Sequence, residues 1–241
     1  MRAILVDWLV EVHYKFKLQG STLWLCVNIL DRYLESVPTL RADLQLVGVS
    51  SLLIACKFEE IYPPEVRDCV YITDYAYTRE QVLSMESKIL RQLDYQICVP
   101  TGYHFMMRYL NSLNASDQLR HLSFYYAERN LQEYDMLNCP PNQFAAAALF
   151  AALNHRAADE PAPSTSVWTV ELSELTNYNE GDLMQCASTI LKHVQEETVT
   201  ASKRQLIAAK KKYSAEKYQA ISTLPVPVIS NGIAQQQSSN L

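Results

Sequence analysis

Glycine is scarce in this sequence, with five residues in a chain of 241. An all-β domain needs glycine for its many tight turns, whereas helices need it least. Because 49% of the residues are apolar, the chain has enough hydrophobic side chains for a sizeable core. Together these observations favour an all-α protein built as one large domain or two smaller ones.

Excess positive charge and long apolar runs are also absent. The chain carries 21 Lys and Arg against 26 Asp and Glu, which gives a net charge of −5. This balance argues against nucleic acid as the main ligand, because binding to phosphates requires a concentrated positive surface. No stretch approaches the ~18 uninterrupted apolar residues that a membrane-spanning helix needs. We therefore expect neither nucleic acid nor a membrane among the partners.

Local motifs of catalysis and metal binding are missing as well. The six cysteines form no Cys-x-x-Cys pair, and several lie inside apolar runs, which indicates buried, reduced thiols in an intracellular protein. The five histidines form no His-x-x-x-His pair, so we expect no zinc site. Neither a glycine-rich phosphate loop nor a Gly-x-Ser-x-Gly elbow is present. We expect no cofactor, although an enzyme whose residues meet only in space stays an open alternative.

The first residues have a helical pattern with two apolar faces. At about 100° per residue, one stripe contains Met1, Ile4, Leu5, Trp8 and Val12, and a second contains Ala3, Val6, Leu9 and Val10. Such a helix is buried on both faces, or is buried on one and offers a groove on the other. No capping residue precedes Met1, so we expect this helix to start at or before Met1.

The rest of the chain predicts further helices separated by loops. Pro63 and Pro64 end one helix, Ser21 or Thr22 caps another, and Thr78-x-x-Gln81 is a capping box. Beyond the first segment, we expect helices over residues 22–34, 44–60, 65–74, 78–93, 102–113, 116–132, 141–155, 169–175, 181–197 and 202–218. Residues 155–166 are expected to form a loop, and residues 222–241 a flexible tail.

An internal repeat divides these helices into two groups. Residues 77–78 are Tyr-Thr and are followed by Ile89-Leu90; residues 178–179 are Tyr-Asn and are followed, at the same spacing, by Ile190-Leu191. A helix of small residues precedes each of these two segments. Thr78 and Asn179, the second residues of the two matching pairs, are both types that cap helices. The repeat predicts two tandem five-helix units of about 100 residues each, an ordinary domain size.

Two charges break this repeat. Glu86 lies on an otherwise apolar stripe, and the matching position in the second unit is Ala187. Lys57 ends the most apolar helix of the first unit, whereas the matching helix contains no lysine. One interpretation is that Lys57 and Glu86 grip the backbone of a partner protein. The alternative, equally open, is that they only pair with each other, as partly buried charges usually do.

Other features also have competing interpretations. Glu59 and Glu60 near a helix C-terminus oppose the helix dipole, which indicates either an external partner or solvated loop acids. The run 210–212 of three lysines is interpreted as a solvated helix face. On pattern alone, the stripe around Trp8 is core rather than a docking groove.

Five segments carry a specific resemblance to a known family. They are MRAILVDWL at 1–9, LDRYL at 30–34, LQLVG at 44–48, KFEEIYPPE at 57–65 and YITD at 71–74. Together they resemble the cyclin box of the A- and B-type mitotic cyclins. The patterns His13-x-Lys15-Phe16 and YDM at 134–136, followed by Pro140-Pro141, are closer to the B type. The resemblance is dense over residues 1–100 and looser but continuous to about residue 222.

This resemblance implies a fold and a function. The expected fold is two tandem five-helix cyclin folds, over residues 1–98 and 99–221, followed by the tail at 222–241. The implied function is a regulatory subunit, with no chemistry of its own, that binds and activates a cyclin-dependent protein kinase as a heterodimer and controls the G2/M transition. It would be found in the nucleus and the cytoplasm. The alternative is a cyclin-fold transcription regulator or another helical binding module, against which the net charge of −5 and the match at Lys57 and Glu86 speak.

The resemblance also implies two sets of site residues. The kinase-binding set would be Lys57, Glu86, Phe58, Leu90, Tyr95 and Ile97. The docking patch, which would take a basic-x-Leu motif of substrates or inhibitors, would be Met1, Ile4, Leu5, Trp8, Glu11, Leu44, Gln45 and Asp74. Within it, Glu11 and Asp74 would meet the basic residue of the docking peptide. The resemblance thus favours a groove over plain core for the stripe around Trp8.

Overall fold

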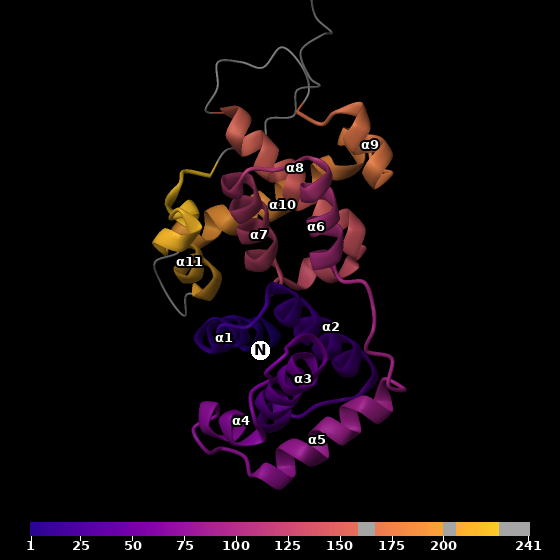
Figure 1. Cartoon of the computed structure of the whole chain (residues 1–241), viewed down its shortest axis with the longest axis vertical. Helices are drawn as coiled ribbons and strands as arrows, with labels where there is room; N and C mark the ends of the chain where they lie inside the picture. Colours follow the sequence, from indigo (N-terminus) through magenta and orange to yellow (C-terminus); the bar gives the residue numbers. More distant parts are fainter. Residues whose placement is uncertain (159–166, 200–205, 227–241) are drawn as a thin grey trace, which may run out of the picture.

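The computed structural model describes residues 1–158, 167–199 and 206–226, and every regular element within them is helical (Figure 1). The first unit contains α1 (Arg2–Phe16), α2 (Gly20–Ser36), α3 (Leu44–Glu59), α4 (Val66–Ile72) and α5 (Arg79–Gln92). The second contains α6 (Gly102–Ser112), α7 (Asp117–Asn130), α8 (Pro141–Ala158), α9 (Val170–Thr176) and α10 (Glu180–Val199). The short α11 (Ala208–Tyr213) follows, and the 3-10 turns are η1 (Arg41–Asp43), η2 (Tyr134–Asn138), η3 (Glu216–Tyr218) and η4 (Ile221–Thr223). The predicted all-α class is confirmed.

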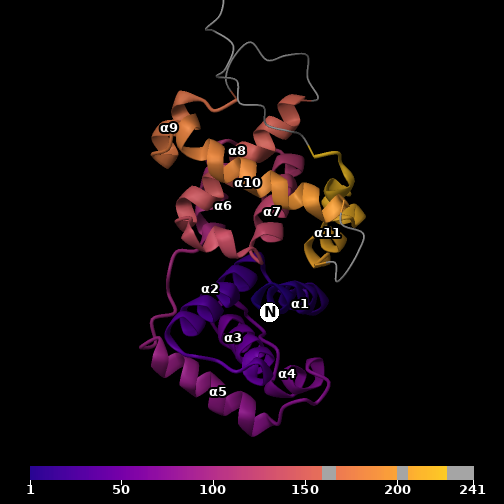
Figure 2. The same ribbon diagram turned by 180° about the vertical axis from the view of Figure 1, so that it is seen from behind.

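Each unit is built around one helix of mostly small side chains. Helix α3 contacts α1, α2, α4 and α5, and α8 contacts α6, α7, α9 and α10 in the same way. The alanines at 145–148 in α8 are fully buried, and small side chains let the surrounding helices approach closely. Figures 1 and 2 show the two units stacked along the long axis, with α1 to α5 in one and α6 to α10 in the other. The predicted tandem arrangement of five-helix units is confirmed for the described residues.

The capping residues of the repeat are also confirmed. Thr78 Oγ1 accepts a hydrogen bond from the backbone N–H of Gln81, and Gln81 Oε1 accepts one from the N–H of Thr78 at 2.8 Å. At the start of α10, Asn179 Oδ1 accepts a hydrogen bond from the N–H of Asp182 at 3.1 Å, and Asp182 Oδ2 accepts one from the N–H of Asn179 at 2.9 Å. Both helices therefore begin with a reciprocal capping box, which satisfies backbone donors that the helix itself leaves free.

The start of α2 is capped differently from the prediction. Its capping position is Gln19, which makes no side-chain cap, so the predicted cap at Ser21 or Thr22 is wrong. Instead, Glu60 Oε1 accepts from the N–H of Gln19 at 2.7 Å and from Thr22 Oγ1 at 2.5 Å, and Glu59 Oε2 accepts from Ser21 Oγ at 2.8 Å. Carboxylates are electrostatically favourable at a helix N-terminus. Glu59 and Glu60 thus tie the end of α3 to the start of α2 and are not simply solvated acids.

The C-terminal part departs furthest from the predictions. The single helix expected over 202–218 is wrong, because α11 ends at Tyr213 and is followed by two 3-10 turns; residues 200–205 lie outside the described residues. Gln219 and Ala220 have φ values of 56° and 49°, which a helix cannot continue through. Ser222 is only 5% exposed, so the tail prediction is wrong at its start. The predicted tail at 227–241 and most of the predicted loop at 155–166 lie outside the described residues, and α8 extends to Ala158.

Helix α11 links the second unit back to the first. It contacts both α1 and α7. The backbone N–H of Ala208 donates to Asp7 Oδ1 at 3.0 Å, and Lys212 Nζ donates to Glu128 Oε2 at 2.6 Å. The side chains of Lys212 and Glu128 are only 4% and 3% exposed. The prediction of a solvated lysine face is therefore wrong for Lys212, whose charge is neutralised by a carboxylate on α7.

Arg2 provides another link between the units. Its guanidinium donates to both carboxylate oxygens of Asp31 in α2, at 2.5 and 2.8 Å. It also donates to the backbone carbonyls of Leu131 and Gln132 in the second unit, at 2.9 and 3.1 Å. A two-pronged guanidinium–carboxylate pair has a fixed geometry, so Arg2 orients α1 relative to both α2 and the end of α7.

Candidate protein-binding site

Lys57 and Glu86 lie on facing helices of the first unit. Lys57 is in the last turn of α3 and Glu86 is in the middle of α5. Lys57 Nζ is 2.6 Å from Glu86 Oε1, and the two side chains are 48% and 12% exposed. In the free chain the charges therefore pair with each other, as the alternative interpretation predicts. Because half of the Lys57 side chain is in solvent, such a pair contributes only ~0–1 kcal/mol to stability.

The pair keeps hydrogen-bonding capacity for other groups. An ammonium has three donors and a carboxylate has two acceptor oxygens. Within the described residues, Lys57 and Glu86 each make this one ion pair, which leaves further donors and an acceptor open. Burial raises the pKa of the Cys69 thiol, which interacts electrostatically with both charges, to about 12, so this neighbour stays neutral. The Cys69 thiol therefore adds no charge beside the pair.

The predicted apolar members of the kinase-binding set differ in accessibility. Phe58, next to Lys57, is 51% exposed, and Tyr95 is 65% exposed. Leu90 is partly buried against the core. Ile97 is 7% exposed and belongs to the core, so little of its side chain is open to a partner.

Two exposed apolar residues near this set were not predicted. Ile61 and Tyr62, in the loop after α3, are 87% and 92% exposed. Single exposed apolar residues are ordinary, but several beside one another indicate an interaction surface. Their position just before Pro63 was visible in the sequence, whereas their exposure depends on where the loop points.

The first turns of α1 present the stripe of the docking patch. Met1 is 57% exposed, Ile4 is 39% exposed and Trp8 is partly buried. Leu5, by contrast, is 7% exposed and packs in the core. The stripe is therefore an open apolar surface with Leu5 as its buried base.

Helix α3 supplies the second wall of the docking patch. Gly48 faces Leu5 so closely that a Cβ on this glycine would lie 2.7 Å from Leu5 Cδ1. Leu44 and Gln45 are partly exposed and lie one turn before Gly48 on the same face of α3. Helices α1 and α3 thus meet at the glycine, and Leu44 and Gln45 lie next to this contact.

Two predicted acidic members of the docking patch are in solvent. Glu11 in α1 and Asp74 after α4 are both exposed. Asp74 has a φ of 55°, in the left-handed region that Asp tolerates better than most residues. Both carboxylates are accessible to a basic side chain of a bound peptide.

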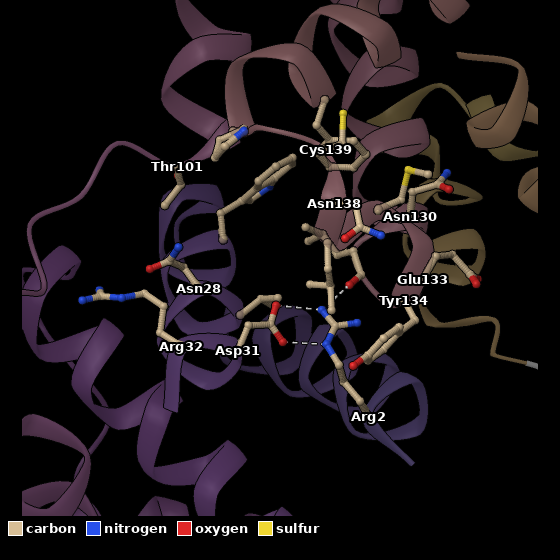
Figure 3. Close-up of a pocket in the computed structure, with 18 of the residues that line it drawn as sticks. Arg2, Asn28, Asp31, Arg32, Thr101, Asn130, Glu133, Tyr134, Asn138 and Cys139 are labelled. Carbon is tan, nitrogen blue, oxygen red and sulfur yellow. Dashed lines mark hydrogen bonds and ion pairs between the residues drawn. The ribbon is translucent and has the colours of Figure 1, made fainter. Parts of the chain in front are cut away.

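A cavity of about 600 Å³ lies between the two units and belongs to neither predicted set (Figure 3). Trp24 and Phe144 contribute apolar surface, with ring centroids 5.9 Å apart. Asn28, Tyr134 and Cys139 also line it. Sequence reasoning missed this cavity because its walls come from residues 2–35 and 101–144, which only the tertiary fold brings together.

The described residues hold no group of three or more His, Cys, Asp or Glu side chains arranged for a metal ion. None of the helices in this part of the chain is long and apolar enough to cross a membrane. The site residues combine exposed apolar side chains with charges that can hydrogen-bond a backbone, as protein-binding surfaces do.

The fold and these surfaces define a helical protein-binding module of the cyclin class. The family model described as "Cyclin, N-terminal domain" matches residues 1–98, and the model "Cyclin, C-terminal domain" matches residues 100–227. The chain therefore belongs to the cyclin family.

Similar known proteins carry mitotic cyclin names. G2/mitotic-specific cyclin S13-7 of Glycine max is 39% identical over 239 residues, which cover 99% of this chain and 89% of that protein. Cyclin-B1-1 of Oryza sativa subsp. japonica is 42% identical over 221 residues, covering 90% and 47%. Cyclin-B1-4 of Arabidopsis thaliana is 41% identical over 227 residues, covering 93% and 56%. The chain spans about half the length of these last two relatives. The predicted resemblance to B-type mitotic cyclins is confirmed.

A solved structure of a viral cyclin from herpesvirus saimiri has the same fold. It superposes with a TM-score of 0.70, covering 81% of this chain and 84% of that one. The sequence identity is 23%, so this likeness bears on the fold alone.

Proposed function

We propose that this chain is a regulatory subunit that binds and activates a cyclin-dependent protein kinase in the cell cycle. Relatives named as G2/mitotic-specific cyclins support a role at the G2/M transition. The observation that carries the proposal is the ion pair of the half-exposed Lys57 with Glu86, next to the exposed Phe58. A pair with one half-exposed member contributes only ~0–1 kcal/mol to stability, so its charges are available to a partner.

In this proposal the ion pair opens when the kinase binds. The Lys57 ammonium donates to backbone carbonyls of a kinase segment, and the Glu86 carboxylate accepts from its backbone N–H groups. The exposed ring of Phe58 then packs against the mobile helix of the kinase. The chain performs no chemistry of its own. It binds the active state of the kinase more tightly than the inactive one, and the population shifts by that difference in free energy.

The docking patch acts separately on substrates. Its apolar stripe at Ile4 and Trp8 takes the leucine of a basic-x-Leu motif, and Glu11 and Asp74 attract the basic residue. The patch lies on α1, the first turn of α3 and the turn after α4, whereas Lys57 is in the last turn of α3 and Glu86 is on α5. Substrate recruitment and kinase activation are therefore expected to be separable by substitution.

The decisive experiment is activation of a purified mitotic cyclin-dependent kinase. Wild type should activate it, and the folded double variant Lys57→Ala, Glu86→Ala should not. A matched control removes the exposed pair Lys192 and Glu196 on α10, which are 3.8 Å apart and 70% and 58% exposed, and should activate like wild type. Circular dichroism verifies the fold of each protein. Equal activation by wild type and the Lys57, Glu86 variant would contradict the proposed grip, and a folded wild type that activates no such kinase would contradict the proposed function.

The docking patch has its own test. Trp8→Ala should leave phosphorylation of a short peptide unchanged while reducing phosphorylation of a protein substrate with a basic-x-Leu motif. An equal loss of phosphorylation for both substrates would contradict the assignment of Trp8 to the docking patch, because it would mean that Trp8 supports the fold or the kinase contact.

We further propose that the chain resides in both nucleus and cytoplasm. A fluorescent fusion imaged through the cell cycle tests this, and confinement to any other compartment would contradict it.

A further inference from the structure

Two of the six cysteines lie side by side on different elements of the second unit. Cys139 lies between η2 and α8, and Cys186 lies in α10. Their Sγ atoms are 3.4 Å apart, and both side chains are partly exposed. Cys26, Cys56 and Cys69, by contrast, are each 0–2% exposed and lie in the core of the first unit.

The surroundings hold these two thiols together. Cys139 Sγ donates to Gln143 Oε1 at 3.7 Å, and Gln143 Nε2 donates to the backbone carbonyl of Asp182 in α10 at 3.2 Å. A disulfide has an S–S length of about 2.0 Å, so the sulfurs need to approach by roughly 1.4 Å.

The two thiols differ in reactivity. The hydrogen bond from Cys186 lowers the pKa of Cys139, although burial opposes this shift. The same hydrogen bond, together with burial, raises the pKa of Cys186. Cys139 also lines the cavity between the two units, which gives a small oxidant access to its sulfur (Figure 3). Cys139, which lines the cavity, is therefore the thiol assigned to react first, with Cys186 as the resolving thiol.

We propose that Cys139 and Cys186 form a reversible intramolecular disulfide when the folded chain meets a hydroperoxide. The Cys139 thiolate attacks one oxygen of hydrogen peroxide, so that an S–O bond forms as the O–O bond breaks and the departing hydroxide takes up a proton to become water. The Cys186 sulfur then attacks the resulting sulfenic acid, the S–S bond forms, and the second water leaves with the Cys186 proton. Two thiols are oxidised and one peroxide is reduced to two waters. A dithiol reverses the reaction by exchange.

The disulfide would tie α10 to the segment between α7 and α8. This segment includes η2, which forms part of the cavity wall. The two cysteines are 47 residues apart, so the bond also closes a long loop in the unfolded chain, which stabilises the folded state. The inference concerns the second unit alone and does not depend on kinase binding.

The test uses the purified full chain, reduced, freed of reductant and exposed to hydrogen peroxide under native conditions. Alkylation of remaining thiols and non-reducing peptide mapping should find a peptide that links Cys139 to Cys186, with a loss of about 2 Da for two hydrogens. The melting temperature should rise and return to its starting value with dithiothreitol. The exposed Cys98 is the matched control, so Cys98→Ser should behave like wild type. Cys139→Ser and Cys186→Ser should lose both the linked peptide and the rise in melting temperature.

The overturning result is complete alkylation of Cys139 and Cys186 after an exposure that oxidises Cys98. A linked peptide that forms only in urea would overturn the proposal equally, because it would require unfolding. Both results come from wild type and do not depend on whether the serine variants fold.

Discussion

Replacement of Lys212 by methionine should destabilise the chain strongly. The Lys212–Glu128 pair joins α11 to α7 at 2.6 Å with side chains only 4% and 3% exposed. Methionine has a similar length but no charge, so the variant leaves the Glu128 carboxylate buried without its cation. Breaking a buried pair in this way costs about 3–5 kcal/mol, a large part of the stability of an ordinary domain.

A double-mutant cycle separates this cost from lost packing. In Lys212→Met, Glu128→Gln neither member of the buried pair carries a charge. The double variant should therefore recover most of the stability lost in Lys212→Met. Urea unfolding followed by circular dichroism measures all four proteins. A loss below about 1 kcal/mol in Lys212→Met, or a double variant less stable than the single one, would refute the role of the buried pair.

Three further predictions concern the first unit. Burial lowers the pKa of His13 to about 4, against about 6.5 in the unfolded chain. Between these two pH values the unfolded state binds a proton that the folded state does not bind. The free energy of unfolding should therefore fall by ~3 kcal/mol from pH 7 to pH 4. Urea unfolding at several pH values measures this slope, and an unchanged slope in His13→Gln would assign it to other groups. Lys57→Ala should change the stability of the free chain by only ~0–1 kcal/mol but weaken kinase binding by ~2–5 kcal/mol. Urea unfolding measures the stability, and calorimetric titration with the kinase measures the binding. A loss of stability without a loss of binding would mean that the pair is purely structural. Gly48→Ala should cost ~1–3 kcal/mol in urea unfolding, because the added methyl group meets Leu5 at 2.7 Å, and a more stable variant would disprove the close contact.

Local signals predicted much of the fold. The capping residues Thr78 and Asn179 act through backbone groups within their own first turn, so the sequence alone locates the helix starts. The prolines at 63 and 64 end α3 for an equally local reason. The repeat of caps and small-residue helices then predicts the two units, because each unit repeats the same local features.

Features that depend on distant partners could not be predicted. Glu60 caps α2 from the end of α3, and its hydrogen-bond partner Thr22 lies 38 residues away in the chain. Lys212 is buried because Glu128, 84 residues earlier, neutralises it. Nothing in a run of three lysines distinguishes the buried Lys212 from the half-buried Lys210 and the exposed Lys211, since the distinction is made by another helix.

The sequence indicated which residues form the candidate site, but it predicted only part of their arrangement in space. The stripe of Met1, Ile4 and Trp8 was visible as a periodic pattern, and the structure exposes Met1 and Ile4. Lys57 and Glu86 were visible as charges out of place, but the sequence could not decide between pairing and gripping. In the free chain they do pair, at 2.6 Å, and gripping stays a proposal in which this pair opens.

The bond between Asp7 and Ala208 has a consequence for how the protein is made. These residues are 201 positions apart, and α11 covers part of α1. During synthesis Asp7 leaves the ribosome 201 residues before its partner Ala208. Part of α1 therefore stays open to solvent until α11 has been made. Contacts of such long sequence separation also slow folding, so this interval is when the nascent chain is most exposed to aggregation and to chaperones.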